Sequence, residues 1–350
     1  MLNINPRLES FIFDDLGAVY HINPEHVAQN LTNDKEANLN YLGTYFPRSF
    51  VESYNIFSNL FKNEHINRAF SKKQVINILD IGSGTGGNLI GLLQVLNSSY
   101  NKRRIEIYSF DGNGIALDYQ MKIIRNVYKY LDRNENVIKI DTFQYRFTNK
   151  DDIKNILEMA RKAGVFDRFD IIHSFKFANE LYAVDDFQNR GTYKALLDIG
   201  EHYLADDGII VIEDITNKVG AIAPQYISII MNNECKEYFN EKTDSRICFI
   251  LPLSCAFWHD NCDSDNCFSK KEFIIRHRYN YRDVSKVTYK VFATVGLAER
   301  VLSDINNCDR HYYAISEDSR NGRYNYCLCG SFLYCQEYPA NSTVIDSFVL

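Results

Sequence analysis

The segment 75–87, VINILDIGSGTGG, constrains the fold more than any other part of the chain. It starts as an apolar run typical of a buried strand and ends in glycines at alternate positions, Gly82, Gly84 and Gly86. Glycine adopts left-handed backbone conformations without a steric penalty and lets a ligand approach the main chain. Residues 88–96 then predict a helix. This order is typical of the nucleotide pocket of a doubly wound sheet, and a tight turn without a ligand is the alternative interpretation.

An acidic residue in front of the glycines indicates which nucleotide binds. Asp80 stands two positions before the GxGxG pattern, which resembles motif I of class I S-adenosylmethionine-dependent methyltransferases rather than a dehydrogenase fingerprint. The resemblance implies that the cofactor is S-adenosylmethionine (SAM). It also implies which residues line the methionine half of the cofactor, namely Asp80 and the glycine turn with Gly82, Ser83, Gly84 and Gly86.

The next strand supplies a second acidic residue. Residues 105–110 predict a strand that ends at Asp111, where the fold needs a carboxylate to accept hydrogen bonds from both ribose hydroxyls. We therefore predict that Asp111 and its neighbour Gly112 bind the cofactor. Thr142 and Phe143 follow the strand predicted at 137–140, and in the methyltransferase fold they are expected beside the adenine ring. Packing in the core is the alternative for Phe143.

Further strands are predicted at 169–175 and 208–214, with helical stretches between them. Right-handed crossovers stack such units into an α/β fold, a doubly wound, mostly parallel, Rossmann-like sheet with the ligand at the carboxyl ends of the strands. A chain of 350 residues with 45% hydrophobic content can bury one large core and a smaller appendage. We expect three parts, namely an N-terminal helical cap at 1–70, a SAM-binding core at 71–235, and a Cys-rich C-terminal extension at 236–350 that completes the sheet.

The N-terminal part shows no strand signature. Apolar and aromatic residues recur at helical spacing between residues 41 and 60, around Pro47. This pattern predicts either a helical lid over the cofactor cleft, which would exclude water, or an amphipathic helix that closes one edge of the sheet.

Composition narrows the class of protein. No apolar run is long enough to cross a bilayer and the N-terminus does not read as a signal peptide, so we expect a cytoplasmic enzyme without a membrane partner. The net charge of −6 argues against a generally cationic nucleic-acid surface. A local basic stripe between residues 270 and 282 is the exception that would still meet phosphates; it comprises Lys270, Lys271, Arg276, His277, Arg278 and Arg282.

All nine cysteines lie after residue 230. A disulfide framework conflicts with the expected compartment, so the cysteines are interpreted as metal ligands, redox thiols or buried small hydrophobes. Cys255, Cys262 and Cys267 fall within thirteen residues, which allows their thiolates to converge on one centre with a fourth from Cys327 or Cys329. Their spacing matches neither a zinc ribbon nor a ferredoxin, so a metal site and metal-free cysteines both stay open.

The order of several segments resembles a specific family, the ribosomal small-subunit methyltransferase-like proteins, whose mitochondrial members are ribosome assembly factors. The resemblance rests on YLGTYFPRSFVESYNIF before motif I, FKFANEL and IED after later strands, ILPLSCAFWHDNCDSDNCF, and CLCG. It implies an iron-sulfur cluster of the [4Fe-4S] type, or zinc in its place. The implied ligands are Cys255, Cys262, Cys267 and Cys329, with Cys327 as an alternative fourth ligand.

Methyl transfer from a sulfonium is an in-line displacement that requires a correctly held nucleophile. The residues after the strand at 169–175 are best placed for this. We predict that Asn179 orients the nucleophile and that Glu180 orients it or takes its proton, with His173 and Lys176 as weaker candidates. A helix cap is the structural alternative for the Asn-Glu pair.

Three functions fit these patterns. The first is a SAM-dependent methyltransferase that acts on ribosomal RNA or in ribosome assembly, with a basic path from the cleft to residues 270–282. The second is a small-molecule or natural-product methyltransferase with an enclosed pocket lined by residues 41–60. The third is a non-catalytic assembly factor that binds the cofactor without turnover.

Overall fold

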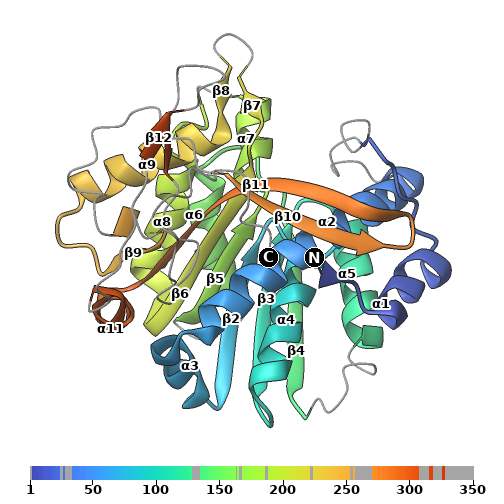
Figure 1. Cartoon of the computed structure of the whole chain (residues 1–350), viewed down its shortest axis with the longest axis horizontal. Coiled ribbons are helices and arrows are strands. Elements are labelled where there is room, and N and C mark those ends of the chain that lie inside the picture. Colours follow the sequence, from blue (N-terminus) through green and yellow to red (C-terminus); the bar gives the residue numbers. More distant parts are fainter. Residues whose placement is uncertain are drawn as a thin grey trace.

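The computed structural model describes residues 2–23, 27, 34–127, 135–162, 164, 168–185, 188–220, 224–252, 255–256, 270–306, 315–317 and 325–327. Figure 1 shows a central twisted sheet with helices on both faces. The parallel part of the sheet is formed by β2 (Val75–Ile81), β3 (Arg104–Asp111), β4 (Val137–Gln144), β5 (Phe169–Phe175) and β6 (Leu204–Ile215). No helix in the described ranges is both long enough and apolar enough to cross a membrane.

The strand order defines the fold. The five parallel strands lie in the order β4-β3-β2-β5-β6, which is 3-2-1-4-5 when they are counted along the chain. The sheet continues through β11 (Asn280–Thr294), which runs antiparallel to β6, and then through β10 (Lys271–His277) and β1 (Leu2–Asn3). Strand β9 (Ile247–Leu251) also pairs with β11. This is the Rossmann-like, doubly wound, mostly parallel sheet that the sequence predicts for a class I methyltransferase.

Alternating apolar residues in the strands create two cores, one on each face of the sheet. In β2, Ile76 and Ile78 face one core while Leu79 and Ile81 face the other. The first core is covered by α2 (Lys35–Lys62), α3 (Glu64–Ser71), α4 (Gly87–Ser99), α5 (Gly114–Val127) and α11 (Val295–Asn306). The second core is covered by α6 (Asp152–Lys162), α7 (Ala178–Val184), α8 (Thr192–Tyr203) and α9 (Ile227–Glu241).

The remaining elements are short. At the N-terminus, α1 (Pro6–Ser10) leads directly into the π-helical turn η1 (Phe11–Asp15). Two small two-stranded sheets are formed by β7 (Lys218–Val219) with β8 (Gln225–Tyr226), and by β12 (Ile315–Glu317) with β13 (Asn325–Cys327).

Helix α2 contains the apolar pattern that the sequence placed at 41–60. Its buried residues include Leu42, Phe46, Phe50, Phe57 and Leu60, and they pack into the first core. Helix α2 lies against α4 rather than at an edge of the sheet (Figure 1). It is therefore chiefly a core helix, and only its N-terminal half reaches the strand ends where a ligand would bind.

Two glycines allow the close packing of α2 on α4. A Cβ atom at Gly87 would lie 2.6 Å from the carbonyl oxygen of Phe46, and one at Gly91 would lie 2.5 Å from that of Phe50. A real Cβ atom does not fit at these distances. Between Phe46 and Phe50, Arg48 forms a buried ion pair with Asp283 of β11, with the Nε atom 2.9 Å from Oδ2. These contacts fix α2 over the first face of the sheet.

Three sequence expectations need correction. The N-terminal part does contain a strand, because β1 pairs in parallel with β10 and uses backbone hydrogen bonds that a two-residue segment does not reveal by pattern. Strand β6 starts at Leu204, four residues earlier than expected. Strand β4 continues to Gln144, because β3 pairs with it as far as Asp111, so Thr142 and Phe143 lie within the strand and not after it.

The packing of α2 on α4 predicts opposite effects of two Gly→Ala substitutions. Gly91→Ala places a methyl group against backbone and should destabilise the protein by about 1–3 kcal/mol, as overpacking does. Gly296→Ala is the control, since this exposed helical glycine has no neighbour closer than 3.8 Å. It should stabilise α11 by about 0.5–1 kcal/mol. Chemical unfolding of both variants tests this, and an equal gain in stability would contradict the close helix contact.

Candidate functional site

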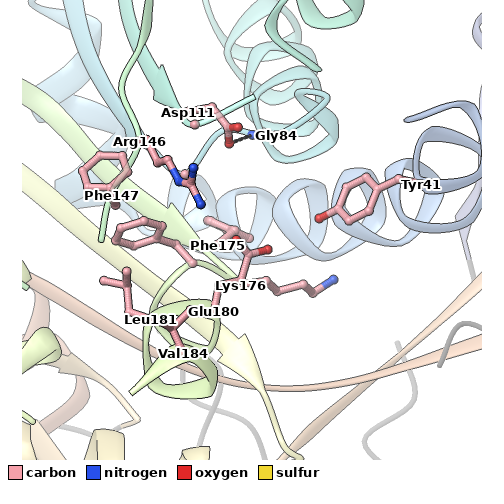
Figure 2. Close-up of a pocket in the computed structure, with 13 residues that line it drawn as sticks. Tyr41, Gly84, Asp111, Arg146, Phe147, Phe175, Lys176, Glu180, Leu181 and Val184 are labelled. Carbon is pink, nitrogen blue, oxygen red and sulfur yellow. Dashed lines mark hydrogen bonds between the residues drawn. The ribbon is translucent and has the colours of Figure 1, made fainter. Parts of the chain in front are cut away.

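A pocket opens at the carboxyl ends of β2, β3 and β5, the place where a doubly wound sheet binds its ligand. Figure 2 shows side chains from several elements pointing into it. The pocket is lined by Tyr41, Gly82, Gly84, Asp111, Gly112, Arg146, Phe147, Phe175, Lys176, Phe177, Glu180, Leu181 and Val184. Six residues predicted from the sequence as cofactor-binding or catalytic are therefore on its wall, namely Gly82, Gly84, Asp111, Gly112, Glu180 and the weaker candidate Lys176.

The glycine turn has a different role at each of its three positions. Gly82, Gly84 and Gly86 all have left-handed φ angles, of 71°, 53° and 84°. A Cβ atom at Gly82 would lie 2.6 Å from the Cβ of Phe177, and one at Gly86 would lie 2.5 Å from the Cγ of Gln120. At Gly84 the nearest atom would be a ring carbon of Tyr41 at 4.0 Å. Gly84 is thus the position where the main chain faces open space in which a ligand fits.

Asp111 connects the glycine turn to the end of β3. Its Oδ2 atom accepts a hydrogen bond from the Gly84 N–H at 2.8 Å (Figure 2), and its Oδ1 atom accepts one from the Asn113 N–H at 2.8 Å. Each carboxylate oxygen can accept at least one further bond. Desolvation raises the pKa of Asp111 to about 6. At neutral pH the group is therefore an ionised acceptor on the pocket wall, which suits a diol.

Asp80 lies beneath the glycine turn and does not line the pocket. It is fully buried, with Oδ1 accepting from the side-chain amide of Asn88 at 3.1 Å and Oδ2 3.5 Å from the amide nitrogen of Gln120. Burial raises the pKa of Asp80 well above its ordinary value. Burial also lowers the pKa of the neighbouring His173 to about 3, so this histidine is neutral. Asp80 supports the turn from below, and Ser83 is buried in the same turn.

The two predicted catalytic residues at the start of α7 point in different directions. Asn179 is buried, and its backbone N–H and side-chain amide donate to Asp214 at 3.0 and 2.7 Å. Glu180 lines the pocket. Desolvation, then the charges of Asp111 and Asp214, raise the pKa of Glu180 to about 8. The carboxyl group of Glu180 therefore changes its charge close to neutral pH, whereas Asn179 anchors the helix.

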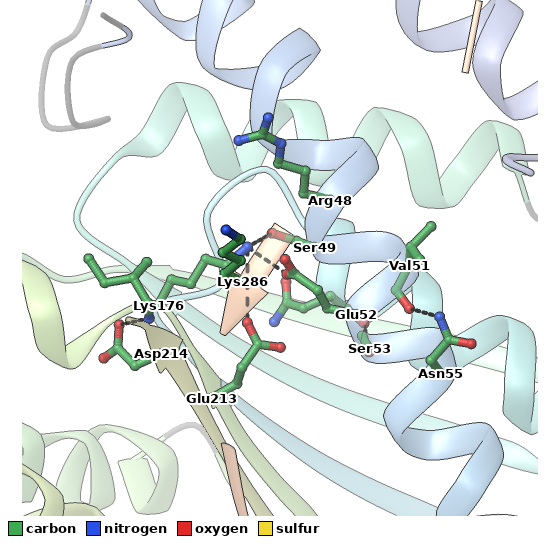
Figure 3. A network of polar contacts seen from close by, with 12 residues as sticks. Arg48, Ser49, Val51, Glu52, Ser53, Asn55, Lys176, Glu213, Asp214 and Lys286 are labelled. Atoms are coloured by element: carbon green, nitrogen blue, oxygen red, sulfur yellow. Dashed lines mark hydrogen bonds and ion pairs between the residues drawn. The ribbon is translucent and has the colours of Figure 1, made fainter. Parts of the chain in front are cut away.

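Lys176 follows β5 and reaches a pair of buried carboxyl groups. Its Nζ atom lies 2.5 Å from Oε2 of Glu52 on α2, 3.5 Å from Oγ of Ser49 and 4.0 Å from Oε1 of Glu213 on β6 (Figure 3). Its backbone has a left-handed φ of 55°, held by a 2.8 Å hydrogen bond from its N–H to the carbonyl of Glu213. Desolvation and the nearby Glu52 raise the pKa of Glu213 well above its ordinary value. The charge of Lys176 is therefore neutralised within this cluster.

Several residues of the wall were not predicted from the sequence. Arg146 and Phe147 follow β4 and come to the pocket because that strand ends later than expected. Phe143 instead stacks on Phe110, with ring centroids 4.7 Å apart, and Thr142 lines a separate shallow hollow beside α5. Had the full length of β4 been predicted from the sequence, Arg146 would have been expected at the pocket, because it follows the end of that strand. The remaining residues of the wall that were not predicted are Phe175, Phe177, Leu181 and Val184, while Tyr41 belongs to the stretch 41–60 that was expected to line an enclosed pocket.

The cysteine prediction falls mostly outside the described residues. Cys262, Cys267 and Cys329 lie there, and so their roles as ligands stay predictions. Cys255 is described, and its Sγ atom lies 3.6 Å from Nζ of the buried Lys290. In the described ranges no three His, Cys, Asp or Glu side chains gather as a metal site.

The basic stripe at 270–282 does not form a continuous cationic surface. Lys271 and His277 are buried. Arg278 is paired with Asp14 and Glu9, with its Nη1 atom 2.6 Å from Oδ1 of Asp14. Lys271 and His277 are therefore not available to phosphates at the surface, whereas Lys270, Arg276 and Arg282 are exposed.

Comparisons with known proteins do not identify a family for this chain. No protein-family model matches the chain, and no curated protein matches it in sequence. Similar solved structures include TehB from Haemophilus influenzae, with 15% identity, a TM-score of 0.34, and 65% of this chain aligned to 60% of that one. They also include the plantazolicin methyltransferase BpumL in complex with SAH, with 13% identity, a TM-score of 0.38, and 82% of this chain aligned to 99% of that one. Membership in the ribosomal methyltransferase-like family stays a prediction from the sequence.

The Lys176 cluster gives a prediction about stability. Lys176→Met leaves the buried Glu52 and Glu213 without a cation and should destabilise the protein by about 3–5 kcal/mol at neutral pH. The loss should shrink as the pH falls, because Glu213, whose pKa is raised well above its ordinary value, is then protonated and needs no partner. Adding Glu52→Gln in the same chain should restore part of the stability. Thermal unfolding from pH 5 to 8 tests this, and a loss that is independent of pH would contradict the assignment.

Proposed function

We propose that this protein is a SAM-dependent methyltransferase whose acceptor carries an N–H or O–H group. The observation that carries the proposal is the pairing of Gly84 with Asp111. Here a left-handed glycine faces open space, and its N–H is held by a carboxylate that is ionised at neutral pH. A nucleoside ligand requires main chain that it can approach closely and, beside it, a carboxylate that accepts hydrogen bonds from the two ribose hydroxyls. The donor and acceptor groups therefore fit the cofactor that motif I implies.

The order of the strands in the sheet sets the orientation in which the cofactor is expected to bind across their carboxyl ends. Asp111 at the end of β3 would accept the ribose hydroxyls, while Arg146 and Phe147 after β4 lie on the side where the resemblance places adenine. The glycine turn after β2 then faces the methionine half. Glu180 and Lys176, which follow β5, lie beyond it and form the wall nearest the acceptor.

Bound SAM supplies an electrophilic methyl group on a positively charged sulfur. Apolar rings of Phe147, Phe175 and Phe177 would keep water from the reacting atoms. In the transfer step the acceptor atom forms a bond to the methyl carbon, the electron pair of the broken S–C bond stays on sulfur, and the acceptor proton passes to the carboxylate of Glu180. A base with a pKa close to the working pH is the efficient choice for this role. An acceptor with a protonated nitrogen or oxygen nucleophile therefore suits this wall.

The described surface favours a small acceptor over RNA. The pocket is bordered by apolar side chains, and the candidate basic stripe is interrupted by burial and pairing with acids. Phosphate contacts from lysine and arginine dominate the affinity of RNA-binding proteins. We therefore infer a small-molecule or natural-product methyltransferase in preference to a ribosomal one or a non-catalytic assembly factor.

Asp111→Asn tests the cofactor site. The substitution keeps the shape of the side chain but removes the charge, so affinity for S-adenosylhomocysteine (SAH) should fall about tenfold or more, since hydrogen bonds to charged groups contribute about 1.5–3 kcal/mol. In the natural protein, affinity should also fall as the pH drops through about 6, where Asp111 protonates. In the variant this dependence should be absent.

Isothermal titration with SAH from pH 5 to 8 measures both effects. Glu135→Gln is the control, because this exposed carboxylate lies at the opposite ends of the strands and its ion pair with Lys102 is exposed to solvent. Equal affinity in the natural protein and Asp111→Asn would refute the ribose site.

The acceptor class is tested with methyl-labelled SAM. Extracts are divided into low-molecular-mass, protein and RNA fractions, and each is incubated with the natural protein or with Glu180→Gln. We expect label in the low-molecular-mass fraction, with a rate reduced about 100-fold or more in Glu180→Gln, as for loss of a general base. Label confined to RNA and removed by ribonuclease would reverse the choice of acceptor.

A further inference from the structure

The pocket has an excess of acidic groups around Glu180. Asp111 and Asp214 both raise its pKa, so their negative charges act on its carboxyl group. Tyr41 on α2 faces the same acids, since burial, then the charges of Glu180 and Asp111, raise its pKa well above the ordinary value. No ion pair joins Glu180 to a cation among the described residues.

The two cations of the pocket wall do not compensate Glu180. Lys176 is directed to Glu52 and Glu213 and not to Glu180. Arg146 lines the wall after β4, where its side chain is exposed, and in the described part of the chain no ion pair joins it to Glu180. The interior of the pocket therefore favours a ligand that brings its own positive charge.

We propose that Glu180 releases its proton when the sulfonium of SAM binds and regains one from the acceptor when the methyl group is transferred, so that the pocket distinguishes SAM from SAH by charge. This inference rests on the proposed function. It gives Glu180 the role of a specificity-determining residue for the charged cofactor. The charges balance, because a sulfonium and a carboxylate enter the transfer step with a neutral acceptor, and neutral SAH and a carboxylic acid leave it with the methylated acceptor.

With the ribose assigned to Asp111, the sulfur would lie in the same pocket that Glu180 lines. The sulfur is joined to the ribose through a single carbon, and the ribose hydroxyls are assigned to Asp111. Glu180 shares the pocket wall with Asp111 and interacts with its charge. A unit positive charge bound between these acids lowers the pKa of the adjacent carboxyl group. SAH carries the same ribose and the same amino acid group but lacks this charge.

The inference predicts how the affinity of the protein for SAM depends on pH. Glu180 is mostly protonated below its pKa of about 8 in the free protein and ionised when SAM is bound. Proton release then opposes SAM binding at low pH, and affinity should be about tenfold weaker at pH 7 than at pH 9, one factor of ten per pH unit below that pKa. Asp111 is ionised throughout this range and does not contribute.

Isothermal titration tests the proposal without turnover. SAM and SAH are titrated at pH 7.0 in two buffers that differ in heat of ionisation, which gives the number of protons released on binding. We expect SAM to release close to one proton more from the natural protein than from Glu180→Gln, and SAH to show no such difference. We also expect a preference for SAM over SAH of about tenfold, the effect of one partly screened charge pair, which falls to within about threefold in Glu180→Gln.

Glu135→Gln is the matched control, because this exposed carboxylate lies at the opposite ends of the strands and its removal should leave the affinities for SAM and SAH unchanged. An unchanged ratio of SAM to SAH affinity in Glu180→Gln, or equal proton release with both ligands, would overturn the proposal while SAH binding still supported the methyltransferase assignment. Failure of both ligands to bind the natural protein would instead refute the proposed function itself.

Discussion

The hydrogen bonds accepted by Asp111 are the interaction on which the rest of the site depends. One carboxylate oxygen holds the N–H of Gly84 and the other holds the N–H of Asn113, so a single side chain fixes the turn after β2 and the start of the helix after β3. The turn is possible only because glycine occupies the left-handed positions. The geometry that leaves Gly84 facing open space is therefore also the geometry that presents Asp111 to a ligand.

The site is built at some cost in stability. Asp111, Asp214 and Glu180 have folded-state pKa values of about 6, 6 and 8, all above those of unfolded carboxyl groups. The free energy of unfolding therefore falls as the pH rises from about 4 through those values, because these carboxyl groups ionise more easily in the unfolded chain than in the folded one. A bound cation offsets this loss. Functional sites often retain such unfavourable charges when the ligand supplies the compensation.

The fold was predictable to the extent that local pattern determines it. One buried strand and the glycine turn are read directly from residues 75–87, and the repeated order of strands and helices after them predicts a mostly parallel sheet with the ligand at the carboxyl ends of the strands. Strand β1 was not predictable, because its two residues are held by pairing with β10, in which Ile275 is the partner of Leu2. The end of β4 was misplaced for the same reason, since pairing with β3 extends it beyond its apolar residues.

The residues of the candidate site also divide into those that the local sequence predicts and those that only tertiary packing places. Gly84, Asp111 and Glu180 were identified because each adjoins a recognisable strand end. Tyr41 belongs to the stretch 41–60 that was expected to line an enclosed pocket, but no local signal singles it out within that stretch, because its place on the wall depends on how α2 packs against α4. Asn179 was expected to orient a nucleophile, but its environment depends on Asp214, a residue of a different strand. Tertiary packing, and not sequence spacing, decides which polar residue faces the pocket and which one supports it.

A crystal structure of the protein with SAH would test the central claim most directly. The account predicts both ribose hydroxyls within hydrogen-bond distance of the Asp111 carboxylate, adenine beside Phe147, and the sulfur on the side of Glu180. A ligand bound elsewhere, or a ribose turned away from Asp111, would contradict it.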